Sequence, residues 1–94
     1  MDTCTYQRRQ VLYSGNVQGV GFRFTTHRIA QDFEITGFVR NLPDRRVELV
    51  AEGSVLQLEN FLAAITVQMA DQIHDTKTDT QPATNEYDSF DIRF

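Results

Sequence analysis

Residues 15–23 read Gly15-Asn16-Val17-Gln18-Gly19-Val20-Gly21-Phe22-Arg23 and lie between a predicted strand and a predicted helix. The three glycines let the backbone curl inward, so that several N–H groups can point at one place. The start of the helix adds its own unpaired N–H groups and the positive end of its dipole. Arg23, in the first turn, can aim its guanidinium at the same place. The segment therefore predicts a cradle for an anion of the size of phosphate.

The spacing of this segment leaves two interpretations open, an anion site and an ordinary tight turn. It lacks the Gly-Lys-Ser/Thr ending of a P-loop, and it lacks the G-x-G-x-x-G spacing of a dinucleotide site. The elements on either side and the rest of the chain must therefore decide between the two interpretations.

Hydrophobic periodicity predicts the neighbouring elements. Residues 10–13 are typical of a strand, and a helix that begins at Phe22 carries one apolar face at 3.6-residue spacing. That face consists of Phe22, Thr26, Ile29, Ala30 and Phe33. A second strand follows over residues 35–40, and we expect it to be joined to a third strand by a hairpin.

The hairpin covers residues 41–45, and its Pro43 and Asp44 suit the middle of a type I turn. The third strand alternates residue by residue. We expect its core face to hold Val47, Leu49 and Ala51, and its solvent face to hold Glu48 and Glu52. A capping box of Ser54 and Gln57 then opens a second helix.

The second helix carries a buried stripe at i, i+3, i+4 and i+7 spacing. Its members are Val55, Leu58, Phe61, Leu62, Ile65 and Met69. Residues 73–80 predict an exposed strand, 81–85 a loop, and 87–94 a closing strand that places Phe90, Ile92 and Phe94 on the core face. The order β-α-β-β-α-β with one extra strand predicts an α+β, ferredoxin-like split βαβ sandwich. Two helices would cover one face of a mostly antiparallel sheet, as a single domain over residues 1–94.

Strand direction brings the polar candidates together at one end of the predicted sheet. In a right-handed βαβ unit the two strands run parallel, so their C-terminal ends lie at the same rim. That rim gathers residues 15–22, Arg23 and Asn41, and the closing strand would bring the terminal carboxylate of Phe94 close to Arg23. The charge of the first half favours this site, because residues 1–46 carry a net +3 whereas residues 47–94 carry a net −7.

Composition argues against several other classes of protein. The 94 residues carry a net charge of −4, which opposes general nucleic-acid binding. No apolar run approaches the roughly 20 residues of a membrane-spanning helix, and the N-terminus has no apolar core of a signal peptide. Cys4 is the only cysteine, so neither an intrachain disulfide nor a cysteine-based metal site can form. We expect a cytoplasmic protein without a membrane or nucleic-acid partner.

Two signatures in register resemble those of the acylphosphatase family. The first is residues 15–23, which departs from the usual form only at Asn16, commonly arginine. The second is Gly37-Phe38-Val39-Arg40-Asn41, followed by Val47 and Gly53. With the order of the predicted elements, the resemblance extends across nearly the whole chain. It implies hydrolysis of small acyl phosphates to a carboxylate and inorganic phosphate, without a metal or a cofactor.

The resemblance also assigns the site residues. Phosphate binding falls to Gly15, Asn16, Val17, Gln18, Gly19, Val20, Gly21, Phe22 and Arg23. Arg23 and the loop amides would hold the phosphoryl oxygens, and Asn41 would orient the attacking water. These roles fit phosphoryl transfer, in which catalysis is mostly positioning plus electrostatic stabilisation. A carboxylate is a good leaving group and needs no general acid. We expect the protein to act as a monomer.

Besides Asn16, three residues depart from the family pattern. Arg45 stands where the family has glycine in a turn that often needs a positive φ, and Glu34 replaces a favoured glycine before the second strand. A left-handed conformation costs a non-glycine residue about 1–2 kcal/mol, so these two bear on stability. Leu42 follows Asn41 where many members carry a hydroxyl residue, which bears on how tightly the water is held.

Other candidate functions have weaker support. A phosphate- or anion-binding module of the same fold, without turnover, is the main alternative, and Asn41 argues for the enzyme because a pure binding module needs no water-orienting amide. Residues 18–24 faintly echo an aromatic RNA-binding motif, but their aromatics fall on a helix rather than a strand. His27 and His74 are too isolated to form a metal site.

Overall fold

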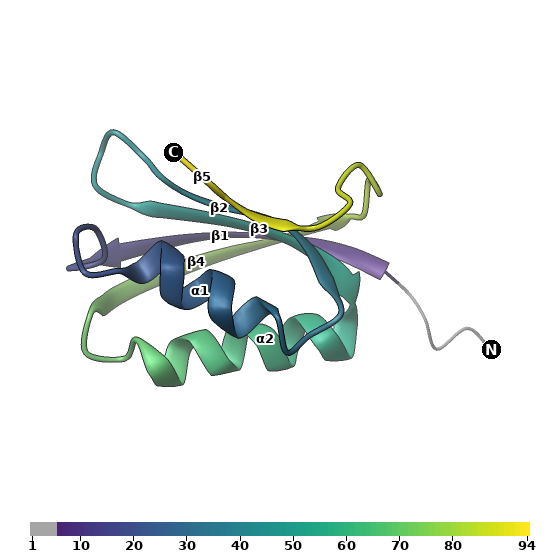
Figure 1. Cartoon of the computed structure of the whole chain (residues 1–94), viewed down its shortest axis with the longest axis horizontal. Coiled ribbons are helices and arrows are strands. Elements are labelled where there is room, and N and C mark those ends of the chain that lie inside the picture. The colour runs from purple at the N-terminus through teal and green to yellow at the C-terminus, as the bar shows by residue number, and fades with distance from the viewer. Residues whose placement is uncertain (1–5) are drawn as a thin grey trace.

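The structure is a computed structural model that describes residues 6–94 (Figure 1). Cys4, from which the sequence excluded a disulfide, lies outside the described residues. The elements in chain order are β1 (Tyr6–Gly15), α1 (Phe22–Ala30), β2 (Ile35–Asn41), β3 (Val47–Ser54), α2 (Val55–Gln68), β4 (Ile73–Pro82) and β5 (Phe90–Arg93). The predicted order is confirmed. β1 is longer than the predicted residues 10–13, and β4 runs two residues further than the predicted 73–80, into the predicted loop.

One five-stranded sheet has the strand order β4-β1-β3-β2-β5. β3 lies antiparallel between β1 and β2, β4 lies antiparallel to β1, and β5 lies parallel to β2. Both helices cover the same face of this sheet (Figure 1). This confirms the α+β, ferredoxin-like split βαβ arrangement with one extra strand.

The core lies between the sheet and the helices. From α1 and α2 it takes Phe22, Ala30, Leu58, Phe61, Ile65 and Met69, and from the strands Val11, Tyr13, Val39, Val47, Leu49, Ala51 and Phe90. The helical stripes are confirmed, with Val55 and Leu62 half-buried at the edges. Among residues 6–94, no helix is both long enough and apolar enough to cross a bilayer.

The start of α2 shows one half of the expected capping box. The Ser54 hydroxyl accepts the Gln57 N–H at 3.3 Å. The Gln57 side chain does not return to Ser54, and its Oε1 instead accepts the Glu34 N–H at 2.9 Å. Glu34 has no positive φ, so the turn before β2 needs no glycine there.

The predicted solvent face of β3 is wrong, because Glu48 and Glu52 are 7% and 2% exposed. Alternation does place them on the face opposite the helices, but Arg8, Arg40 and the loop of residues 83–89 contact them there. The Glu48 carboxylate accepts Arg40 Nε at 2.6 Å and Gln10 Nε2 at 2.7 Å. Burial of a carboxylate is tolerated when it is hydrogen-bonded and paired in this way.

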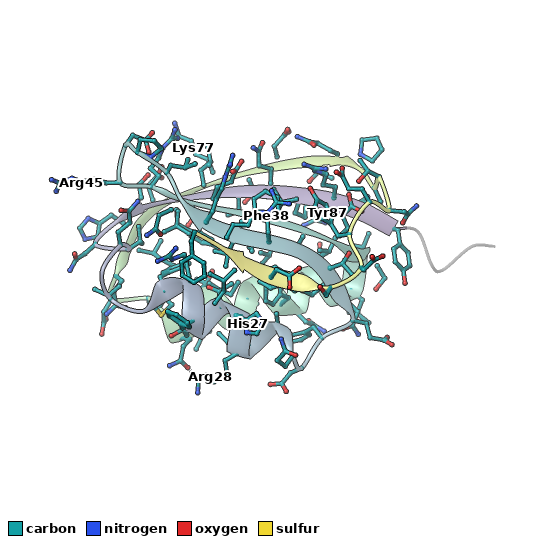
Figure 2. All side chains as sticks on the ribbon, turned by 45° about the horizontal axis from the view of Figure 1, so that its top comes forward. His27, Arg28, Phe38, Arg45, Lys77 and Tyr87 are labelled. Carbon is teal, nitrogen blue, oxygen red and sulfur yellow. The ribbon has the colours of Figure 1, made fainter. Side chains whose placement is uncertain are left out.

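The same covered face carries the aromatic residues of a small second cluster. Figure 2 shows Phe38 and Tyr87 close together over the sheet, and their ring centroids lie 5.9 Å apart. The Arg93 guanidinium lies 3.8 Å from the Phe38 ring centroid, and Phe38 is buried. Long arginine stems thus act as apolar cover for this side of the sheet.

The closing strand is shorter than predicted. β5 begins at Phe90 and ends at Arg93, with Phe90 buried and Ile92 half-buried. The placement of Phe94 on the core face is wrong, since Phe94 is 92% exposed. Because Phe94 lies beyond the last residue of β5, the alternation of the strand does not determine where its side chain points. The parallel pairing of β2 with β5 brings the C-terminus to the rim that holds Asn41, as predicted.

Candidate active site

The loop after β1 is fixed at its first residues. Gly15 has a φ of 123° at an irregularity in the β1–β4 pairing. A Cβ there would lie 2.6 Å from the Gln72 carbonyl oxygen and 2.7 Å from the His74 nitrogen, so only glycine fits. The Asn16 N–H then donates to the Gln72 carbonyl at 2.9 Å. The loop therefore starts from a rigid contact with the turn before β4.

The other two loop glycines are required for their backbone angles. Gly19 and Gly21 both have a φ of 77°, and a Cβ on either would meet nothing within 4 Å. Gly21 caps α1 without a side-chain hydrogen bond, and the first turn of α1 holds no acidic residue. The space around these glycines is open, and no carboxylate of the helix competes for the helix end.

The loop N–H groups beyond Asn16 have no backbone partner in the described part of the chain. Within residues 6–94, the backbone hydrogen bonds outside helices and strands include none donated by the N–H groups of residues 17–21. The first N–H groups of α1 likewise have no intrahelical partner, because every α-helix begins with such unpaired donors. N–H groups that converge at a helix N-terminus form a binding site for phosphate-sized anions.

Gln18 ties this loop to the β2–β3 hairpin. Its Nε2 donates to the Leu42 carbonyl at 2.9 Å and to the Arg46 carbonyl at 3.0 Å. Leu42 directly follows Asn41, so the contact sets the separation between the loop and the end of β2. The Gln18 side chain thus binds the hairpin, and its backbone N–H takes no part in this contact.

A cavity of about 210 Å³ brings the predicted catalytic pair and the loop together. It is lined by Val17, Gly19, Gly21, Phe22, Arg23, Phe24 and Asn41. Asn41 reaches it as the last residue of β2, opposite Val47 in the register with β3. The lining contains one cationic side chain and no carboxylate or imidazole, so its charge favours an anion.

The remaining predicted phosphate-binding residues lie beside this cavity. Gly15, Asn16 and Gln18 line a neighbouring hollow of about 340 Å³, together with Gly19 and Arg45. Val20 lies between the two loop glycines and is 40% exposed. The whole segment therefore surrounds one region, but its side chains do not all face the cavity.

The end of the chain holds Arg23 in place. Arg23 Nη1 donates to the Arg93 carbonyl oxygen at 3.1 Å, and its Cζ lies 4.8 Å from the Phe94 ring centroid. The expected approach of the C-terminus to Arg23 is confirmed, but not through the terminal carboxylate. Among residues 6–94 no ion pair involves Arg23. A carbonyl and an aromatic face orient the guanidinium instead.

Arg45 in the β2–β3 hairpin adopts the positive φ that glycine favours. The Arg45 N–H donates to the Leu42 carbonyl at 3.2 Å, and Arg45 has a φ of 74°. Figure 2 shows the Arg45 side chain pointing outward from the hairpin. Beside it, hydrogen bonds from the Arg46 side chain and N–H lower the pKa of Asp44. The departure at Arg45 therefore leaves the turn intact and the residue strained.

The two histidines lie outside the cavity lining. The His27 ring centroid lies 6.5 Å from that of Phe90, and the exposed His74 lies against Gly15. In the described part of the chain, no three His, Cys, Asp or Glu side chains are grouped as metal ligands.

The sequence did not indicate two residues at this site, and it assigned the wrong group of a third. Phe24 lines the cavity, and the Arg93 carbonyl holds Arg23. Phe94 was expected beside Arg23, but it makes the contact with its ring and not with its terminal carboxylate. Phe24 could have been predicted, because it directly follows Arg23 in the first turn of the predicted helix. A backbone carbonyl leaves no trace in side-chain patterns, so Arg93 could not be found in that way.

Known proteins resemble this chain in sequence and in architecture. The family model named Acylphosphatase matches residues 9–92. The chain is 52% identical over 56 residues to an acylphosphatase of Archaeoglobus fulgidus, a match that covers 60% of this chain and 63% of the relative. It is 42% identical over 81 residues to an acylphosphatase of Lactobacillus johnsonii, covering 84% and 89%. A crystal structure of acylphosphatase from Bacillus subtilis superposes with a TM-score of 0.84 at 27% identity, covering 94% and 99%.

Proposed function

The chain belongs to the acylphosphatase family, and from this membership we propose that it hydrolyses acyl phosphates to a carboxylate and inorganic phosphate. One observation carries the proposal. A single cavity is lined by Arg23, Asn41 and a glycine loop whose N–H groups are unpaired within residues 6–94. Such a cavity can hold a phosphoryl group and a water molecule side by side.

The loop and Arg23 bind the phosphoryl group. Backbone N–H groups around Gly19 and Gly21 donate to its oxygens, and the N-terminus of α1 adds the positive end of the helix dipole. The guanidinium of Arg23 donates in a fork, which suits two phosphoryl oxygens. The charge of the transition state is spread over those oxygens, so fixed donors stabilise it without rearrangement.

Asn41 orients the attacking water. Its side-chain amide offers both an acceptor and donors, and it lines the cavity from the end of β2. The water oxygen attacks phosphorus, the bond from phosphorus to the bridging oxygen breaks, and its electron pair leaves with the carboxylate. A phosphoryl oxygen of the substrate takes the proton of the water, so the step needs no side-chain base.

An anion-binding module without turnover is the alternative. It would need the loop and Arg23 but not the amide of Asn41, so Asn41 favours hydrolysis. We also propose that the protein is a cytoplasmic monomer. Size-exclusion chromatography with light scattering tests the oligomeric state.

The proposed reaction predicts a sharp substrate limit. The purified protein should hydrolyse acetyl phosphate in the presence of a chelator and leave phosphate monoesters essentially untouched. The cavity lining offers an arginine and amides, and no acid that could protonate an alkoxide leaving group. Release of phosphate, followed with and without chelator, measures both. Activity that disappears with chelator, or a monoesterase rate equal to the acyl phosphate rate, contradicts the proposal.

A further inference from the structure

Exposed apolar side chains gather at the mouth of the phosphate cavity. Six large apolar side chains are exposed among residues 6–94. Three of them, Val20, Phe24 and Phe94, lie at or next to the cavity, with exposed fractions of 40%, 62% and 92%. Half of the exposed large apolar residues thus lie at or next to this one cavity. Clusters of this kind on a small protein mark binding surfaces.

Contacts link two of these residues to the catalytic arginine. Phe24 lines the cavity directly after Arg23, and its ring centroid lies 6.5 Å from that of Phe94. The Phe94 ring lies under the Arg23 guanidinium, with 4.8 Å between Cζ and the ring centroid. Phe24 and Phe94 therefore form one aromatic edge that begins where the phosphoryl group is held. Val20 adds an apolar side chain from between the two loop glycines.

The size of the cavity places the rest of the substrate at this edge. Its volume of about 210 Å³ is below the ~300–1,000 Å³ of pockets that enclose a whole small-molecule ligand. With a phosphoryl group and a water inside, the acyl group must extend out through the mouth. Phe24 both lines the cavity and is exposed to solvent, so its ring lies at the cavity edge, and the exposed Phe94 ring lies next to it.

We propose that Phe24 and Phe94, with Val20, form an acyl subsite that favours acyl phosphates with an aromatic or extended apolar acyl group. The inference rests on the proposed function and names its substrate class. The acyl group lies over the aromatic edge while the phosphoryl group stays in the cradle. The alternative is an anionic acyl group drawn to Arg45, which lines the neighbouring hollow.

The test compares three probes that differ in the acyl group: acetyl phosphate, benzoyl phosphate and succinyl phosphate. The values of kcat/KM are measured for the unaltered protein and for the variants Phe24→Ala and Phe24→Leu. Leu56→Ala is the matched control, because Leu56 is an equally exposed apolar residue on α2, away from the cavity. The ratio of benzoyl to acetyl phosphate, compared between variants, cancels the intrinsic reactivity of the two substrates.

We expect Phe24→Ala to lower the benzoyl-to-acetyl ratio about three- to tenfold, the size of one aromatic contact. Phe24→Leu should lower it less, and Leu56→Ala should leave it unchanged. Phe24 is exposed, and alanine is a better helix former, so the variant should fold. Three results would overturn the subsite. The first is an equal loss of kcat/KM with benzoyl and acetyl phosphate in Phe24→Ala, and the second is a preference of the unaltered protein for succinyl phosphate. The third is a change of oligomeric state in Phe24→Ala with an unchanged benzoyl-to-acetyl ratio.

Binding without turnover separates this inference from the proposed function. Benzoylphosphonate and acetylphosphonate carry phosphorus directly on the acyl carbon and are not cleaved by the reaction. If no acyl phosphate is hydrolysed but benzoylphosphonate binds more tightly in a Phe24-dependent way, the function is wrong and the subsite stands. If acyl phosphates are hydrolysed and neither the kcat/KM ratio nor the phosphonate preference depends on Phe24, the subsite is wrong and the function stands.

Discussion

Arg23 and Asn41 line one cavity, and the proposed reaction gives them separable tasks. Arg23→Gln should lose both affinity for inorganic phosphate and turnover, because the fork donates to phosphoryl oxygens in the ground state and in the transition state. Asn41→Ala should keep phosphate affinity within a few-fold and lose roughly 10²–10³ in turnover, the scale of one positioned polar group. Phosphate inhibition and kcat measure the two effects. Normal turnover in Asn41→Ala would show that Asn41 does not orient the water.

Arg45 is strained by its own backbone, with a φ of 74°. Arg45→Gly removes a left-handed penalty of about 1–2 kcal/mol, which exceeds the ~0.5–1 kcal/mol entropic cost of glycine. The free energy of unfolding should therefore rise by roughly 0.5–1 kcal/mol. Urea unfolding measures it, and Arg45→Ala, which keeps the strain, is the control. Destabilisation by glycine would mean that the guanidinium itself stabilises the turn.

At the scale of elements, residues 15–21, the proposed phosphate loop, are joined to the β2–β3 hairpin by the side chain of Gln18. Gln18→Met removes both hydrogen bonds to the Leu42 and Arg46 carbonyls, so Asn41 should lose its fixed distance from the loop. We expect a loss of stability of about 1–2 kcal/mol and a fall in kcat larger than the fall in phosphate affinity. Gln31→Met is the control, because the Gln31 amide also donates to a backbone carbonyl, that of His27, on the exposed side of α1. Equal effects of both variants on kcat would contradict a positioning role.

Element patterns predicted the helices well and the strand faces less well. The stripe of α2 was found because six apolar residues at helical spacing have no other simple explanation. Alternation in β3 correctly put Glu48 and Glu52 on the face opposite the helices, but it could not show what covers that face. Part of the cover, Gln10 and the loop before β5, is distant in sequence from β3. Arg40 lies opposite Glu48 across the hairpin, but strand alternation does not show that its side chain pairs with Glu48.

The sequence predicted the main residues of the cavity but not all of the contacts around them. Glycine spacing and strand direction together placed Arg23 and Asn41 at one rim, and the cavity lining confirms that they meet. Strand direction also brought the C-terminus there. Arg23 is held by the carbonyl of Arg93, the last residue of β5, and by the ring of Phe94 beyond it. Neither contact follows from periodicity.

At the scale of the whole molecule, the stability of the fold at acid pH depends on the contacts of Glu52 with the loop before β5. Burial raises the pKa of Glu52, but hydrogen bonds from the Thr84 N–H and hydroxyl and from the Asn85 N–H, with the charge of Arg8, outweigh it and leave the pKa lowered. A carboxyl with a lowered pKa in the folded state stabilises the fold above its unfolded pKa. That stabilisation is lost as the pH falls through the folded pKa.

Glu52→Gln should therefore cost about 1–3 kcal/mol at pH 7, and the difference from the unaltered protein should shrink well below the unfolded pKa of about 4.3. Unfolding free energies across this pH range measure it. Glu59→Gln is the control, because the Glu59 side chain is 63% exposed and lies 3.9 Å from Arg9. A difference that stays constant with pH would show that the charge of Glu52 is not what stabilises the loop.

The order of the strands in the sheet also determines how the molecule folds. β1 pairs Val11 with Thr78 on β4, and β2 pairs Gly37 with Phe90 on β5, so both outer strands join partners far along the chain. High contact order of this kind slows folding, to milliseconds or longer, because long loops must close before their contacts form. The phosphate loop depends on the same late events, since Asn16 is anchored to Gln72 beside β4. During refolding, the ability to bind phosphate should therefore return only when the last strand pairings form, well after the two helices.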